Sequence, residues 1–174
     1  MGRLLNYAGI ELTVKAPELL LAGVDERFIR QMLMELISNG AKAVKKLEGE
    51  RHVRLTLVQH EDRAVFTVED NGKGIAPDQL SYLFCSAEEA VPDWRRGGVG
   101  VAIARRVAAL HGGTLVAECA EGRGLRVAAS IPLGQLEEKI LREPGAAWDL
   151  GGFDGELVAL SNLLPAEAFR PKDN

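Results

Sequence analysis

The feature that most constrains the fold is a long segment with helical periodicity, which starts at Asp25 and ends before Gly49. Its apolar residues recur at the spacing that places them on one side of a helix. They are Phe28, Met32, Leu36 and Ala43 on one face, with Ile29, Leu33, Ile37 and Val44 beside them. Asp25 is a residue type that caps helix N-termini, and Gly49 is one that ends helices. We therefore expect one helix of about 23 residues that buries its apolar side against another layer.

Strands and shorter helices are predicted around this helix. Residues 52–59 and 63–70 alternate apolar and polar side chains, as half-buried strands do, and Glu61-Asp62 between them predicts a hairpin turn. The other expected elements are one or two short strands in residues 11–21, a short helix from Pro77 to about Phe84, a helix over residues 101–110, and strands at residues 114–120 and 125–133 joined by a turn at residues 122–124. This order predicts an α+β fold, a two-layer sandwich with helices on one face of a mixed, mainly antiparallel sheet.

Composition bounds the class of protein. The chain has 174 residues, of which 47% are hydrophobic and 26% charged, and its formal net charge is −4. It lacks the basic excess of a nucleic-acid-binding protein, and no segment approaches the roughly 20 apolar residues of a membrane span. Cys85 and Cys119 have neither disulfide-framework nor metal-site spacing, so we interpret them as reduced thiols. We expect a cytoplasmic domain, or the cytoplasmic part of a membrane-bound sensor, without nucleic-acid or membrane contact of its own.

The predicted long helix carries a polar stripe. Glu35, Asn39 and Lys42 stand at positions i, i+4 and i+7, and Lys46 falls on the same stripe. A carboxylate and a carboxamide oxygen can coordinate Mg²⁺, which takes its other ligands from water and phosphates, and a lysine can neutralise phosphate charge. The alternative is an ordinary solvated helix face with charge pairing.

Two glycine motifs change the balance between these interpretations. Asp70-Asn71-Gly72-Lys73-Gly74-Ile75 follows a strand directly, so its glycines can approach a planar ligand and Asp70 can accept a hydrogen bond from an exocyclic amine. The alternative is a plain turn. Gly97-Gly98-Val99-Gly100 precedes a helix, where free amides and the helix dipole favour anions. It does not fit the Walker pattern, because no Gly-Lys-Ser/Thr follows, and a loop rather than a strand precedes it.

The segments ELISNGAKA, VEDNGKGI and GGVGVAIARRVAALHGG, in this order and spacing, resemble the nucleotide-binding boxes of the GHKL (Bergerat-fold) ATPase superfamily. That superfamily includes histidine kinases, gyrase-type topoisomerases, mismatch-repair ATPases and heat-shock chaperone ATPases. The resemblance covers residues 18–133. It leaves residues 1–17 as a lead-in with the first strand, and residues 134–174 as an appendage that we expect to pack on the domain.

The resemblance implies specific roles in ATP binding. Asn39 resembles the Mg²⁺-binding asparagine, and Lys42 the phosphate-contacting lysine of histidine kinases. Asp70 resembles the adenine-reading aspartate. The remaining implied contacts come from the two glycine motifs, with Gly72, Gly74 and Ile75 at the base and Gly98, Val99 and Gly100 at the phosphates.

Within the superfamily, ARRVAALHGGTL and GRGLRVAASIPL look most like the C-terminal catalytic domain of a bacterial sensor histidine kinase. Three positions depart from that pattern. Glu35 stands where many histidine kinases have asparagine. Glutamate there is typical of hydrolytic members, in which it orients or deprotonates water, but some kinases carry it as well. We expect residues 85–97 to form a loop of the length usual for lids, and Ala87 stands near where a second lid phenylalanine is expected after Phe84. Arg96 replaces a frequent first glycine of the phosphate box.

The phosphoacceptor of a histidine kinase is a histidine on a helical hairpin. His52 and His60 flank a predicted strand, and His111 ends a predicted helix, so all three are interpreted as structural or surface residues. The expected function is therefore an ATP-binding catalytic domain that donates the γ-phosphate to a hairpin histidine absent from this chain and, through it, to a response regulator.

Within that expected function, Glu35 and Lys42 are the catalytic candidates, and Arg95 or Arg96 could reach the γ-phosphate from the lid. Two alternatives remain open at this point. One is a hydrolytic or protein-serine-kinase module that uses Glu35 as general base. The other is a non-catalytic nucleotide-binding interaction domain.

Overall fold

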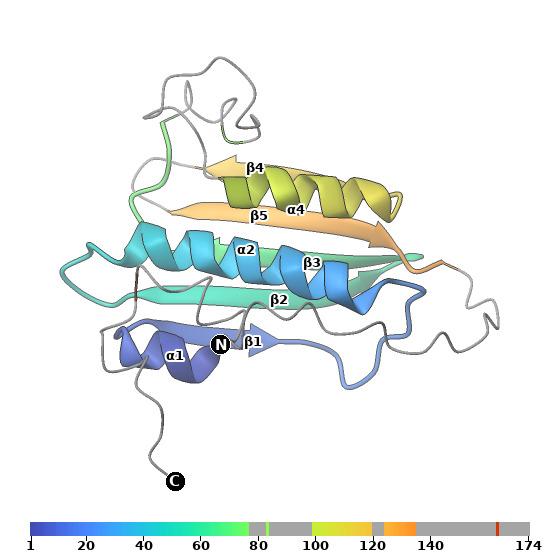
Figure 1. Cartoon of the computed structure of the whole chain (residues 1–174). Helices are drawn as coiled ribbons and strands as arrows, with labels where there is room; N and C mark the ends of the chain where they lie inside the picture. The colour runs from blue at the N-terminus through green and yellow to red at the C-terminus, as the bar shows by residue number, and fades with distance from the viewer. Residues whose placement is uncertain (77–82, 84–98, 120–123, 135–162, 164–174) are drawn as a thin grey trace, which may run out of the picture.

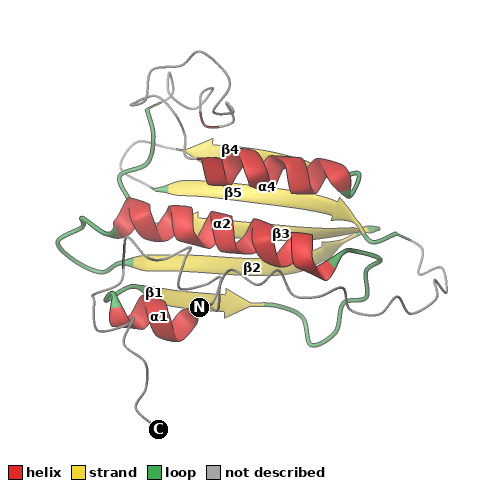
Figure 2. Cartoon of the chain, in the orientation of Figure 1, coloured by secondary structure: helices red, strands yellow, loops and turns green. Residues whose placement is uncertain are grey.

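The computed structural model describes residues 1–76, 83, 99–119, 124–134 and 163. They form a five-stranded sheet with helices on one face, which confirms the predicted α+β sandwich (Figure 1, Figure 2). The strands are β1 (Glu11–Lys15), β2 (His52–His60), β3 (Arg63–Asp70), β4 (Thr114–Cys119) and β5 (Leu125–Pro132). They lie in the order β1-β2-β3-β5-β4; β1 and β2 are parallel and the other neighbours are antiparallel. The helices are α1 (Gly2–Tyr7), α2 (Glu26–Val44) and α4 (Val99–Leu110).

Helix α2 begins as predicted and ends earlier. The Asp25 side chain accepts a hydrogen bond from the Arg27 backbone N–H at 2.9 Å, which is an N-cap. The helix ends at Val44, about a turn before the predicted stop. Lys45 and Lys46 after Val44 are exposed. Leu47 packs against the core from a turn beyond the helix, in which its backbone N–H donates to the Val44 carbonyl at 3.0 Å.

The buried face of α2 is rotated from the predicted one. Phe28 is 41% exposed and Ala43 is also exposed, so the prediction that both face the core was wrong. The Phe28 ring lies edge-on to His111 near the end of α4, and Ala43 faces the loop after β3. Because α2 packs on both the sheet and α4, its buried stripe is set by two neighbours. Its members are Met32, Leu36, Ile37, Ser38, Gly40, Ala41 and Val44.

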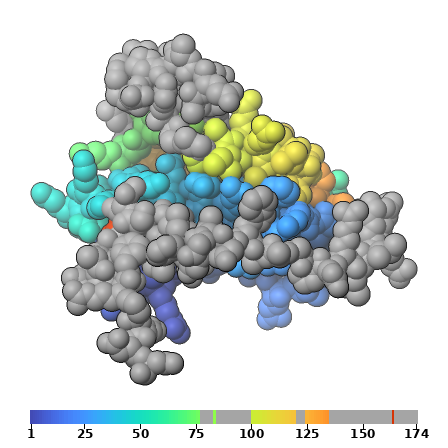
Figure 3. Space-filling view, in the orientation of Figure 1, coloured from blue at the N-terminus to red at the C-terminus, as the bar shows by residue number. Residues whose placement is uncertain are grey.

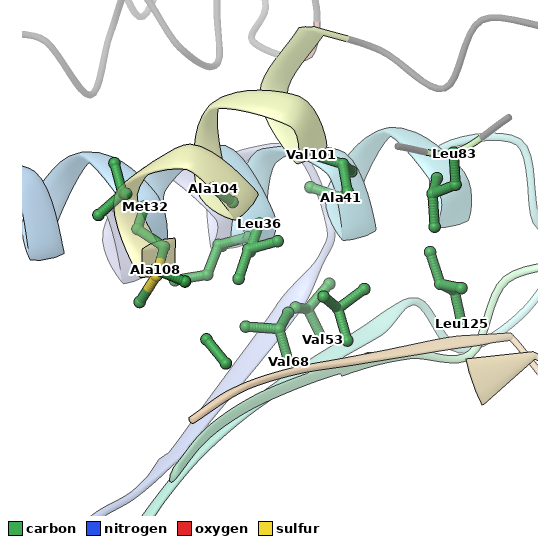
Figure 4. Close-up of a cluster of buried hydrophobic side chains, with 14 of the residues drawn as sticks. Met32, Leu36, Ala41, Val53, Val68, Leu83, Val101, Ala104, Ala108 and Leu125 are labelled. Carbon is green, nitrogen blue, oxygen red and sulfur yellow. The ribbon is translucent and has the colours of Figure 1, made fainter. Parts of the chain in front are cut away.

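The core lies between the two helices and the sheet. Figure 4 shows Met32, Leu36 and Ala41 of α2 beside Val101, Ala104 and Ala108 of α4, above Val53, Val68 and Leu125 of the sheet. Small alanines on both helices allow close approach, and α2 and α4 form adjoining parts of one face of the molecule (Figure 3). This packing fixes the end of α2 relative to the start of α4.

One helix was not predicted. Residues 2–7 form the short helix α1, too short to show a period, and it buries Leu5 completely. Leu163, from the appendage that was expected to pack on the domain, is 7% exposed and belongs to the hydrophobic core. The predicted helix near residues 77–84 (except Leu83), the lid, the turn at 122–123 and the segment after Gly134 (except Leu163) lie outside the described residues. Among the helices that are described, none is long and apolar enough to cross a membrane.

Candidate nucleotide site

One end of the sheet gathers the predicted site residues. At this end α2, β3 and β4 end, and β5 and α4 begin (Figure 1). Asp70 is the last residue of β3 and pairs with Val53, a buried residue on the helix side of the sheet. A Cβ on Gly40 would lie 3.4 Å from the Cβ of Asp70, so α2 passes closely over the end of the strand. The Asp70 side chain therefore lies between the sheet and α2.

Asp70 has one oxygen engaged. Its Oδ1 accepts hydrogen bonds from the backbone N–H groups of Gly72 at 2.8 Å and Leu125 at 3.4 Å. Burial raises the pKa of Asp70 above its ordinary value, while these two donors act in the opposite direction. Within the described residues, Oδ2 has no hydrogen-bond donor. A half-buried carboxylate with one free oxygen can accept a hydrogen bond from a ligand amine.

The loop after β3 lies close against α2. A Cβ on Gly72 would lie 3.1 Å from the Cβ of Ala43 and 2.7 Å from Asp70 Oδ1, so a side chain has no room there. Gly74 has φ +74°, a backbone conformation that favours glycine. The predicted base-side residues Asp70, Gly72, Gly74 and Ile75 thus form one continuous loop beside α2.

The polar stripe of α2 faces the same end of the molecule. Glu35 and Asn39 are half-buried, and Lys42 is exposed in the last turn. No hydrogen bond or ion pair engages any of these three side chains within the part of the chain that is described. Lys46 follows the end of α2, so the prediction that it shares the helical stripe was wrong.

The start of α4 lies against this stripe. A Cβ on Gly100 would lie 2.6 Å from Glu35 Oε2, so the first turn of α4 is close to the Glu35 carboxylate. The free amides of a helix N-terminus favour an anion there. Val99 is the first residue of α4, as the glycine motif predicts, and Gly98 lies outside the described residues, as do Arg95, Arg96, Phe84 and Ala87.

Sequence reasoning missed two side chains that hold the base-side loop. Asn71, predicted only as a turn former, hydrogen bonds to the backbone of residues 50 and 52. Cys119, predicted only as a reduced thiol, hydrogen bonds to the backbone of Ile75. The Asp-Asn-Gly motif could have drawn attention to Asn71, whereas nothing in the sequence singled out Cys119.

Two of the histidines have structural partners, as predicted. His111 Nδ1 lies 2.8 Å from the Val107 carbonyl, and its Nε2 accepts from the Asp25 backbone N–H at 3.2 Å. His52 Nε2 lies 2.8 Å from Thr13 Oγ1. These contacts use the imidazoles to join elements of the fold.

A hollow lies away from these residues. It has a volume of about 430 Å³ and lies between the α1–β1 connection and the residues just before β2. It is lined by Asn6, Gly9, Ile10, Glu11, Gly49, Glu50 and Arg51. None of the predicted nucleotide-binding residues lines it.

Comparison with known proteins supports an ATP-binding domain. Residues 24–135 match the protein-family model described as "Histidine kinase-, DNA gyrase B-, and HSP90-like ATPase". The sensor histidine kinase RppB of Synechocystis sp. is 36% identical over 106 residues, which are 58% of this chain and 23% of that protein. The sensor histidine kinase MtrB of Mycobacterium bovis is 35% identical over 138 residues, which are 76% of this chain and 24% of that protein.

A solved structure with AMPPNP bound has a similar fold. Full-length ShkA in complex with AMPPNP has a TM-score of 0.64 and 27% sequence identity, and the match covers 76% of this chain and 27% of that one. The chain spans between 12% and 24% of the lengths of the curated relatives it matches. Because these relatives are named as histidine kinases or sensor proteins, the comparisons favour a kinase domain over the hydrolytic alternative.

Proposed function

We propose that this chain, which belongs to the histidine kinase-, DNA gyrase B- and HSP90-like ATPase family, is the ATP-binding catalytic domain of a sensor histidine kinase. It would donate the γ-phosphate of ATP to a histidine on a helical hairpin outside these 174 residues, and the hairpin would pass it to a response regulator. Residues 18–133 would form the catalytic domain, acting in the cytoplasm.

One observation carries this proposal. The carboxylate of Asp70, the polar stripe of α2 and the first turn of α4 meet at one end of the sheet. An adenine amine, a triphosphate and a cation need these three kinds of group close together. A solvated helix face and a plain turn would not require that arrangement.

The proposed ATP contacts fall into two groups, one at the adenine base and one at the phosphates. Asp70 Oδ2 would accept a hydrogen bond from the adenine amine, with Gly72, Gly74 and Ile75 forming the wall beside the ring. Lys42 and the amides of Gly98, Val99 and Gly100 would balance the charge of the phosphates. Phosphoryl transfer needs positioning and charge stabilisation more than covalent participation by the protein.

The donor set on α2 fits Mg²⁺. Asn39 offers a half-buried carboxamide oxygen with no hydrogen-bond partner within the described residues, and Glu35 stands one turn before it. Mg²⁺ takes one or two protein oxygens and completes its shell with water and phosphate oxygens. Asn39 would hold the ion, which when bound neutralises charge on the phosphates.

Glu35 would act on the incoming nucleophile. Its carboxylate lies at the first turn of α4, where the predicted phosphate site begins. In the kinase reaction it would orient the acceptor imidazole or accept its proton.

Phosphotransfer to a separate acceptor tests the proposal. The domain would be mixed with γ-labelled ATP, Mg²⁺ and a purified histidine-hairpin fragment from a sensor kinase. We expect label on the hairpin, and none when its histidine is replaced by glutamine. Release of labelled phosphate without any labelled hairpin would instead indicate a hydrolase, and absence of ATP binding by calorimetry would contradict both activities.

A further inference from the structure

The loop that follows β3, residues 70–75, is held on two opposite sides by side chains outside the predicted binding set. We propose that Asn71 and Cys119 are positioning residues: they fix this loop before nucleotide arrives and thereby set the preference for adenine. This inference rests on the proposed function, since it assigns the loop to base recognition.

Asn71 fastens the loop on the β2 side. Its Oδ1 accepts a hydrogen bond from the His52 backbone N–H at 2.8 Å, and its Nδ2 donates to the Glu50 carbonyl at 2.8 Å. Its own backbone N–H donates to the His52 carbonyl at 3.2 Å. Three hydrogen bonds therefore join the loop to the chain segment that enters β2, although the Asn71 residue is exposed.

Cys119 fastens the other end of the loop. Its Sγ accepts a hydrogen bond from the Ile75 backbone N–H at 2.8 Å. Its S–H lies within 3.2 Å of two carbonyl oxygens, those of Ile75 and Gly124, and can donate to either. The thiol thus bridges the end of the loop and the residue that leads into β5.

The hydrogen bonds made by Asn71 and by Cys119 each lie next to a backbone donor to the Asp70 carboxylate. Asn71 directly precedes Gly72, and Gly124 directly precedes Leu125; these are the two residues whose backbone N–H groups bind Asp70 Oδ1. Cys119 is also the strand partner of Leu125. Loss of either side chain would loosen one of the two donors and allow the carboxylate to rotate.

A fixed carboxylate discriminates between bases in a way that a rotating one does not. Held by Oδ1, Asp70 presents Oδ2 as a hydrogen-bond acceptor, which suits the amine at position 6 of adenine. Hypoxanthine carries a carbonyl oxygen there, and two acceptors face to face repel each other. If the Asp70 carboxylate can turn away, both the repulsion of hypoxanthine and the hydrogen bond to adenine are weakened, so the preference for adenine decreases.

Calorimetric titration of the whole chain with ATP and with inosine triphosphate, both with Mg²⁺, tests the proposal. The variants are Asn71→Ala, Cys119→Ala and the conservative Cys119→Ser, with Asn6→Ala as an exposed asparagine control. We expect Asn71→Ala and Cys119→Ala to weaken ATP binding about tenfold, the size of one lost hydrogen bond. Inosine triphosphate binding should change about twofold or less, and Cys119→Ser should restore the wild-type preference because its hydroxyl both donates and accepts.

Two outcomes would overturn the positioning role while leaving the proposed function intact. One is an unchanged ratio of the two affinities in both alanine variants. The other is an equal loss for both nucleotides, which would indicate general destabilisation. If the wild-type chain binds no ATP, the proposed function fails, and amide hydrogen exchange at Ile75 without nucleotide still tests the fastening. Faster exchange in Cys119→Ala is expected, and unchanged exchange would contradict it.

Discussion

At the base end of the site, the Asp70 carboxylate is held by the backbone N–H groups of Gly72 and Leu125. At the phosphate end, Glu35 and Asn39 have no hydrogen-bond partner within the described residues, although both are half-buried. The first group is arranged before a ligand arrives, and the second keeps its oxygens available. The difference matches the two tasks, since a base is selected by fixed geometry whereas phosphates and a cation are bound by charge.

The cost of the two arrangements also differs. The Asp70 carboxylate loses hydration, which raises its pKa, so the folded chain holds an ionised group in an unfavourable place. The oxygens of Glu35 and Asn39 can exchange water for ligand with little strain. Replacing Asp70 should therefore change ATP affinity and the free energy of unfolding, whereas replacing Glu35 should change mainly the rate of phosphotransfer.

The largest effect is expected at Glu35, at the phosphate end. Glu35→Gln keeps the shape of the side chain but removes its ability to accept a proton. Transfer to the hairpin should fall by about a hundredfold or more, the usual range for a lost general base, while the affinity for ATP stays within about twofold of wild type. Single-turnover phosphotransfer measures the first quantity and calorimetry the second.

Glu26→Gln is the matched control for that variant, because Glu26 lies in the first turn of the same helix and its carboxylate pairs with Arg30 at 2.7 Å. Transfer rates that are equal in the two variants would remove Glu35 from the mechanism.

Asp70→Asn tests the base end. The amide oxygen can keep the bonds from Gly72 and Leu125, which turns the –NH₂ group toward the adenine amine, so that two donors face each other. ATP affinity should fall about a hundredfold, which corresponds to the loss of a hydrogen bond to a charged group. The free energy of unfolding at neutral pH should not fall, because the buried charge is removed.

Asp62→Asn, in the β2–β3 turn, provides the control for Asp70→Asn. A large loss of stability in Asp70→Asn would show that the carboxylate serves the fold, which contradicts its assignment to the base.

Gly100→Ala tests the contact between the two helices. A Cβ there would lie 2.6 Å from Glu35 Oε2, so the carboxylate must move while the helix itself gains a better helix former. Transfer should fall about tenfold without loss of thermal stability. Gly49→Ala serves as control, because nothing lies within 4 Å of its Cβ position. An unchanged transfer rate in Gly100→Ala would show that the position of Glu35 is not critical.

The smallest effect is expected from pH. The folded pKa of Asp70 is raised above the unfolded value of 3.8, so its contribution to stability is fully present below that value and is lost as pH rises through the folded pKa. ATP affinity should rise over the same window, because the ionised form accepts the adenine amine. Urea unfolding and ATP titration across this range, with Asp70→Asn subtracted, measure both trends. If the difference between wild type and Asp70→Asn does not change with pH, burial does not raise the pKa of Asp70.

The sequence predicted the elements whose patterns are long or punctuated. Asp25 marked the start of α2, the alternation through Phe66 and Val68 gave β3, and the turn at Glu61 takes the positive φ of +54°. The buried face of α2 was partly wrong, because periodicity alone does not show that a helix packs on two neighbours. The end of α2 was wrong for a related reason, since propensity continues through Lys46 while burial does not.

The sequence points to the candidate site where side-chain chemistry stands in the motif, as at Asn39 and Asp70, whose roles stay predictions. The site was not predictable where backbone groups decide the geometry. The bond from Leu125 to Asp70 joins residues that are distant in sequence, and it depends on the β3–β5 pairing. The thiol of Cys119 and the backbone of Ile75 are also distant in sequence and are brought together by the sheet. Neither contact can therefore be read from a local sequence pattern.

We expect ATP to bind at the end of the sheet where α2 ends and α4 begins, with its base on Asp70. Titration of the ¹⁵N-labelled chain with ATP and Mg²⁺, followed by NMR, tests it most directly. We expect the largest amide shifts in residues 70–75 and at the start of α4, and a shift of the Asn39 side-chain amide. Shifts centred instead on the hollow lined by Asn6 and Arg51, with residues 70–75 unchanged, would contradict it.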